Sequence, residues 1–196
     1  MVDIELIPTF NLGWLSGLIL FVIFLVTEGI LVLMFPKNAR GRLFEYDHSR
    51  WSKKHLIQFV IGKSLALVYL ALIIFAPLKT GSLVFIFGIL LYAIGLIGFV
   101  VAVINFKNTP LDQPVTRGVY RISRNPQVVM LFILTTGISL ATASWLAFFI
   151  LVLSVLFSRS RILEEEKACL ARYGDSYRNY MKCIPQYFLI KTHVKD

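Results

Sequence analysis

Two segments of the chain combine charged, aromatic and turn-forming residues densely enough to form a binding or catalytic site. Residues 112–128 read Asp-Gln-Pro-Val-Thr-Arg-Gly-Val-Tyr-Arg-Ile-Ser-Arg-Asn-Pro-Gln-Val, in which prolines and a glycine mark turns and Tyr120 offers an aromatic face. In residues 159–180, Arg161 and Glu165 are four residues apart and share one face of a helix. These residue types suit the binding of a charged ligand.

Each segment also has an ordinary structural explanation. A basic loop beside a membrane span commonly contacts lipid headgroups. An arginine and a glutamate four residues apart commonly stabilise the helix that carries them. The residue types alone therefore leave open whether either segment is a site.

The composition indicates an integral membrane protein. Hydrophobic residues make up 57% of the 196 residues, only 16% are charged, and the mean hydropathy is +0.74, whereas a soluble domain has about 25% charged residues. The net charge of +9 comes from basic residues between apolar runs, which is typical of juxtamembrane loops and argues against nucleic-acid binding. Cys169 and Cys183 have no histidine at ligand spacing, so we expect no metal site.

Apolar length and charge predict five membrane-spanning helices. About 20 apolar residues cross the hydrocarbon core as a helix, and the runs 12–35, 56–78 and 83–106 meet this length. The fourth run, 126–157, is too long for one span and short for two. If it folds back near residues 139–144, every basic segment lies in the cytosol, as positive loops do.

We therefore expect an all-α, multi-pass membrane protein with the N-terminus outside and the C-terminus in the cytosol. The fifth span should continue into the cytosol, because good helix formers follow Phe157, and a second helix should begin after Gly174. Residues 1–104 would form three N-terminal spans. Residues 105–196 would form a cofactor-binding region made of a loop, a helical hairpin and cytosolic helices.

Two features within the spans predict how the helices pack. Gly88, Gly95 and Ala102 recur every seven residues, which predicts close contact with another helix. Glu28 and Lys63 lie at similar depth on consecutive spans. Because isolated charges in hydrocarbon are unfavourable, we expect these two side chains to form an ion pair.

The two polar segments together resemble the isoprenylcysteine carboxyl methyltransferases. Residues 117–126, Arg-Gly-Val-Tyr-Arg-Ile-Ser-Arg-Asn-Pro, are similar to that family's Gly-x-Tyr…Arg-His-Pro segment. Residues 161–166, 173–180 and 184–185 are similar to its C-terminal signature of glutamates, Phe/Tyr-Gly, two tyrosines and Val-Pro. The resemblance covers roughly residues 105–188, and its two halves flank the predicted hairpin. The wider group includes phospholipid N-methyltransferases.

The resemblance implies a membrane methyltransferase that uses S-adenosylmethionine, releases S-adenosylhomocysteine and needs no metal. By motif position, Arg161 would face the substrate and Glu165 would bind the cofactor. The other residues implied to line the cofactor pocket are Asn105, Asp112, Gln113, Pro114, Val115, Tyr120, Asn125, Pro126, Gln127 and Val128. The pocket would lie at the cytosolic face and open to the bilayer, so that a lipid-like or prenylated substrate enters among membrane lipids.

The chain departs from the family's pattern at two of these positions. The family usually has histidine where this chain has Asn125, and commonly tyrosine where it has Val128. Asparagine still donates and accepts hydrogen bonds, so cofactor binding remains expected. A role that needs a titrating imidazole is not expected at this position.

The residue types fit methyl transfer from a sulfonium. Glu165 can pair with the cofactor's ammonium, backbone N–H groups of residues 112–115 can bind its carboxylate, and Tyr120 can lend a ring face. A carboxylate acceptor is already a nucleophile at neutral pH, whereas an amine must lose a proton, and no histidine lies in the motif region. We therefore expect a carboxylate acceptor positioned by Arg161.

Three alternatives stay open at this point. The first is a phospholipid N-methyltransferase, and the second is a related sterol-reductase-like protein that uses a nicotinamide cofactor. The third is a non-catalytic membrane scaffold, which Asn125 favours. Binding of S-adenosylmethionine separates them.

Overall fold

The computed structural model describes residues 16–36, 51–110 and 112–188. These residues form the α-helices α1 (Gly17–Leu33), α3 (Lys53–Phe75), α4 (Leu83–Lys107), α5 (Pro126–Ala141), α6 (Trp145–Tyr173) and α7 (Asp175–Cys183), and the short 3-10 helix η2 (Gly118–Arg121). The same residues contain no strand, and an isolated bridge joins Ser16 to Pro77. The predicted all-α fold class is confirmed.

Three of these helices, α3, α4 and α6, are long and apolar enough to cross a membrane. The other two predicted spans are the shorter apolar helices α1 and α5. The chain is therefore a helical membrane protein with three candidate spans, while crossing by α1 and α5 stays a prediction.

The predicted helical hairpin is present, and the predicted extension of its second helix is helical. α5 ends at Ala141 and α6 begins at Trp145, so the turn between them lies within the predicted segment 139–144. α6 then runs unbroken to Tyr173, and α7 begins after Gly174, whose φ of 55° suits glycine.

Serine side chains begin three of the long helices. The hydroxyl of Ser52 accepts the backbone N–H of His55, that of Ser82 accepts Phe85, and that of Ser144 accepts Ala147. Each hydroxyl satisfies one of the N–H groups that a helix leaves without a partner at its first turn. α5 begins instead at Pro126, which has no N–H to satisfy.

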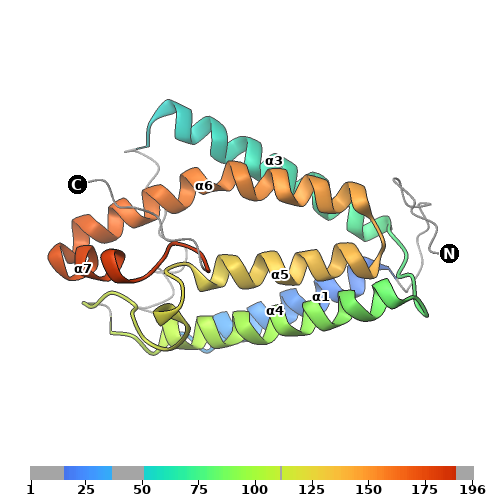
Figure 1. Ribbon diagram of the computed structural model, residues 1–196, viewed down its shortest axis with the longest axis horizontal. Coiled ribbons are helices and arrows are strands. Elements are labelled where there is room, and N and C mark those ends of the chain that lie inside the picture. The colour runs from blue at the N-terminus through green and yellow to red at the C-terminus, as the bar shows by residue number, and fades with distance from the viewer. Residues whose placement is uncertain (1–15, 37–50, 111, 189–196) are drawn as a thin grey trace.

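The helices pack as two close pairs, α4 with α5 and α3 with α6, which lie side by side along the bundle (Figure 1). A Cβ atom on Gly88 would lie 2.4 Å from the Ala141 nitrogen, and one on Gly95 would lie 2.5 Å from the Leu134 nitrogen. Ala102 is fully buried. The predicted close-packing stripe is therefore confirmed, and α5 is the helix that it meets.

The predicted ion pair between Glu28 and Lys63 is wrong. The ion pairs of the described residues do not include it, and the Lys63 ammonium lies 5.7 Å from the centre of the Phe59 ring. α1 meets α3 where Gly17 approaches Ile73, but further along the two helices contact different neighbours. Phe24 of α1 makes an edge-to-face contact with Phe99 of α4, whereas Gly62 of α3 contacts α6.

One end of the bundle carries the polar segments that the sequence singles out. At the opposite end, the connections between helices are tied together, for example by the Lys79 N–H donating to the Ala141 carbonyl over 2.9 Å. At the polar end, the C-terminal part of α6, α7, and the segment between α4 and α5 gather against one another (Figure 1). This arrangement positions the candidate site.

Candidate functional site

A cavity of about 690 Å³ lies at the polar end of the bundle. One wall comes from the segment between α4 and α5 and the first turn of α5, and the other comes from residues 161–173 of α6. Trp51 and Phe106 add apolar surface. Ligand sites have volumes of about 300–1,000 Å³, so the two polar segments enclose a space that a cofactor-sized molecule can occupy.

Eight of the sequence-predicted site residues line this cavity. They come from both walls and are Pro114, Val115, Tyr120, Asn125, Gln127, Val128, Arg161 and Glu165. The fold therefore brings the two halves of the predicted site together.

The other four predicted residues do not lie on the cavity wall. Asp112 and Gln113 are exposed, and Pro126 is buried where α5 begins. Asn105 lies under η2, because a Cβ atom on Gly118 would come within 2.2 Å of the Asn105 side-chain nitrogen. Two of the four thus lie in an exposed loop, and two lie behind the wall; their contacts with a cofactor stay a prediction.

The three consecutive glutamates of α6 make three different contacts. Glu164 forms an ion pair with the Nδ1 of His55 and accepts a hydrogen bond from the Nζ of Lys167 over 2.8 Å. In Glu165, one carboxylate oxygen lies 3.2 Å from the Nε of Arg161. The Glu165 side chain is 33% exposed, whereas those of Glu164 and Glu166 are 9% and 7% exposed.

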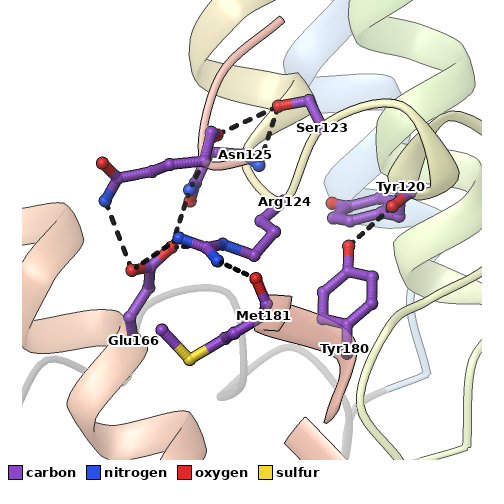
Figure 2. A network of polar contacts seen from close by, with 8 residues as sticks. Tyr120, Ser123, Arg124, Asn125, Glu166, Tyr180 and Met181 are labelled. Carbon is purple, nitrogen blue, oxygen red and sulfur yellow. Dashed lines mark hydrogen bonds and ion pairs between the residues drawn. The ribbon is translucent and has the colours of Figure 1, made fainter. Parts of the chain in front are cut away.

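Glu166 forms a buried ion pair with Arg124 (Figure 2). The Nε of Arg124 donates to one carboxylate oxygen over 3.0 Å, and Nη2 donates to the other over 3.3 Å. The third guanidinium nitrogen, Nη1, donates to the carbonyl of Met181 over 2.9 Å. This two-pronged geometry is the strongest that an arginine and a carboxylate form, and it joins α6 to the residue that precedes Asn125.

Asn125 takes part in the same network. Its side-chain nitrogen donates to Glu166 over 3.4 Å and to the carbonyl of Gln186 over 3.3 Å, and its backbone N–H donates to the hydroxyl of Ser123. The amide at this position therefore holds the wall together by donating hydrogen bonds. This explains how asparagine can stand where the resembled family has histidine.

Tyr120 forms a buried part of the same wall. Its hydroxyl accepts a hydrogen bond from the Nε2 of Gln127 over 3.0 Å. Its carbonyl accepts one from the hydroxyl of Tyr180 over 2.6 Å (Figure 2). Burial raises the pKa of the Tyr180 phenol above its ordinary value, so the phenol stays protonated and able to donate. α7 thereby fixes the turn that carries Tyr120.

The sequence-based prediction missed Arg124 and Glu166. A signal for Glu166 was present, because it follows Ile162 by four residues and Ile162 is 1% exposed, so both lie on the buried face of α6. Arg124 belongs to the motif but was not assigned a role. The two cysteines also separate: Cys169 lines the cavity, whereas Cys183 is exposed on α7.

Comparisons with known proteins agree with this geometry. Residues 81–176 match the family model described as phospholipid methyltransferase. No curated protein and no solved structure matches the chain. The matched region runs from the turn before α4 to the start of α7 and includes both walls of the cavity. Residues 81–176 thus match the phospholipid methyltransferase domain, whose family includes isoprenylcysteine carboxyl methyltransferase-like proteins.

Proposed function

We propose that the cavity binds S-adenosylmethionine and that the protein transfers its methyl group to a carboxylate of a lipid-like or prenylated substrate. One observation carries the proposal: both halves of the methyltransferase motif line a single cavity of about 690 Å³. The chemistry of the lining residues supports it, with a carboxylate, arginines and apolar surface facing one space.

The cofactor's ammonium needs a carboxylate that the cavity can reach. Glu166 already accepts from Arg124, Asn125 and Gln186, and Glu164 is engaged by His55 and Lys167. Glu165 has the most exposed side chain of the three. These contacts favour Glu165 as the ligand of the ammonium, as its motif position implies.

Arg161 lies beside that ammonium site, because its Nε is 3.2 Å from the Glu165 carboxylate. S-adenosylmethionine, when bound, supplies an activated methyl group on a sulfonium. The task of the chain is then to hold the acceptor in line, at about 3–3.5 Å from the reacting carbon. The Arg161 guanidinium can orient a substrate carboxylate there, while Trp51, Phe106 and Val128 offer apolar surface to the lipid-like part.

The nature of the acceptor follows from which groups could take a proton. No histidine is among the described residues that line the cavity. A carboxylate acceptor needs no base, whereas a protonated amine does. The family description favours the second candidate, an amine in a phospholipid headgroup. Alkali separates the two: a methyl ester releases its transferred methyl as methanol, whereas an N-methyl product keeps it.

Binding of S-adenosylhomocysteine to the purified protein in detergent, measured by calorimetry, tests the proposal. A single saturable site supports a methyltransferase. Absence of binding would favour a non-catalytic scaffold of the same fold. Binding of a nicotinamide cofactor instead would favour the reductase-like alternative.

The proposed orientation places the cavity in the cytosol and the N-terminus outside. Single cysteines in a cysteine-free chain test this by their reaction with a membrane-impermeant thiol reagent. Positions 80 and 145 should react from outside, and positions 117 and 175 only after permeabilisation. The turn between α5 and α6 is predicted to lie outside, and position 142 within it would be the simplest choice. Thr142 is buried, however, so the neighbouring position 145 is used, where Trp145 is 41% exposed. Position 40, in the first basic loop, lies outside the described residues.

A further inference from the structure

Gln186 lies beyond the matched family region, yet its side chain reaches the cavity wall. The side chain is one of the most completely buried in the described chain, with Gln186 2% exposed. Its Nε2 donates to a carboxylate oxygen of Glu166 over 3.3 Å. A buried amide that bonds a buried carboxylate is a specific contact, because both groups have lost water and would be left with fewer hydrogen bonds without each other.

The segment that carries Gln186 closes the two walls of the cavity together. We call residues 181–186 the C-terminal clasp. Its Pro185 carbonyl accepts the Arg124 N–H over 2.9 Å, and its Met181 carbonyl accepts the Arg124 guanidinium. The Gln186 carbonyl accepts the Ser123 hydroxyl over 3.1 Å and the Asn125 side chain over 3.3 Å. The clasp therefore bonds the loop wall through its backbone and the α6 wall through the Gln186 side chain.

We propose that Gln186 is a positioning residue for the cofactor site. It fixes the Glu166 carboxylate, and through that carboxylate it holds Arg124 and Asn125 at a set distance from α6. The inference rests on the proposed function, because the separation of the two walls matters for a ligand that contacts both.

The geometry explains why one amide has this effect. The Glu166 carboxylate accepts hydrogen bonds from Arg124, Asn125 and Gln186, so both of its oxygens are held. Without the amide, the Oε2 of Glu166 accepts a hydrogen bond from Arg124 but none from Gln186. The α6 wall then has no side-chain hydrogen bond to Gln186 of the clasp. The walls then separate more often, and a ligand that bridges them must close them as it binds.

The variant Gln186→Met removes the amide and keeps the length of the side chain. Asn179→Leu is the matched control, because it removes an exposed amide from α7 nearby. Two measurements are made well below the melting temperature. One is the rate at which N-ethylmaleimide modifies Cys169 in the unliganded protein, relative to the exposed Cys183. The other is the Kd for S-adenosylhomocysteine.

We expect Gln186→Met to raise the relative rate at Cys169 by about ten-fold and to weaken S-adenosylhomocysteine binding by a similar factor, as for loss of a hydrogen bond to a charged group. Asn179→Leu should change neither. The exchange Glu166→Gln with Gln186→Glu keeps one carboxylate and one amide in contact and should recover part of the Cys169 protection that either single change loses.

A lower melting temperature with an unchanged Cys169 rate and unchanged Kd would overturn the proposal and leave Gln186 a purely structural residue. If Gln186→Met does not fold, Gln186→Asn, which withdraws the amide from Glu166, is judged by the same two measurements. If the wild-type protein does not bind S-adenosylhomocysteine, the proposed function fails. The Cys169 rates of the unliganded proteins still decide whether Gln186 sets the separation of the walls.

Discussion

Two arginine–glutamate pairs stand side by side at the cavity, and they differ in what surrounds them. Arg124 and Glu166 come from separate segments and are buried, with side chains 2% and 7% exposed. Arg161 and Glu165 lie one turn apart on α6, with side chains 27% and 33% exposed. Glu165 and Glu166 are adjacent in the sequence, so a step of one residue around the helix separates the buried contact of Glu166 from the ligand-facing role proposed for Glu165.

The comparison shows why identical chemistry has different consequences in the two places. A buried ion pair gains little net stability when compared with apolar residues, but removing one partner leaves an uncompensated charge in the interior. The second pair is only partly buried, so it can be broken and re-formed at a lower cost than the first. The first pair suits a fixed wall, and the second suits a site whose charges must turn toward a ligand.

The largest effect is expected from Glu166→Gln. The substitution preserves shape but leaves the Arg124 guanidinium buried without its counter-charge, which costs about 3–5 kcal/mol of unfolding free energy. Thermal or chemical denaturation in detergent measures the loss. The same change at the neighbouring residue, Glu165→Gln, is the matched control. Equal and small losses in the two variants would remove the distinction between the pairs.

Glu165→Gln should act on binding. We expect the loss of a charge-assisted hydrogen bond to the cofactor's ammonium, worth roughly 1.5–3 kcal/mol, or about ten- to 150-fold in the Kd for S-adenosylmethionine. Calorimetric titration of the folded variant measures it. An unchanged Kd would take Glu165 out of the site.

Arg161→Lys should act on turnover. Lysine keeps the positive charge but loses the planar fork that orients a carboxylate, so we expect turnover to fall by roughly ten-fold while cofactor binding stays near that of the wild type. Steady-state kinetics and titration of the same preparation separate the two quantities. A collapse of cofactor affinity would reverse the roles assigned to Arg161 and Glu165.

The smallest effect concerns the stability contributed by the partly exposed pair Arg161–Glu165. In a double-mutant cycle with Arg161→Met and Glu165→Gln, the coupling in unfolding free energy should stay below about 1 kcal/mol, as for other pairs within one turn of a helix that are not fully buried. Denaturation of the four proteins under one set of conditions gives this value. A coupling of several kcal/mol would make Arg161–Glu165 a structural pair like Arg124–Glu166.

Much of the fold could be predicted because the bilayer restricts it. Apolar length located the helices, and charge placed the turn between α5 and α6 within residues 139–144, where residues 142–144 form it. The Gly88 and Gly95 stripe revealed a close helix contact, although not its partner α5. Depth in the membrane, by contrast, does not say toward which neighbour a side chain points, and for this reason the Glu28–Lys63 pair was wrong.

The site could be predicted only as far as motif position reaches. Motif position identified Arg161, Glu165 and most of the loop wall. It did not distinguish the contacts of the three glutamates, because these depend on how α6 is rotated against the loop. It also did not find Gln186, whose partner Glu166 is 20 residues away in the sequence and is brought close only by the turn at Gly174.

Protection of Cys169 by S-adenosylhomocysteine tests the central claim most directly, because it reports binding and its location together. Cys169 lines the cavity and Cys183 is exposed elsewhere, so the wild-type chain contains both the probe and its internal reference. We predict that saturating S-adenosylhomocysteine slows N-ethylmaleimide modification of Cys169 and leaves Cys183 unchanged, and that Glu165→Gln shifts this protection to higher ligand concentration. Unchanged modification of both cysteines at saturating ligand would contradict the account.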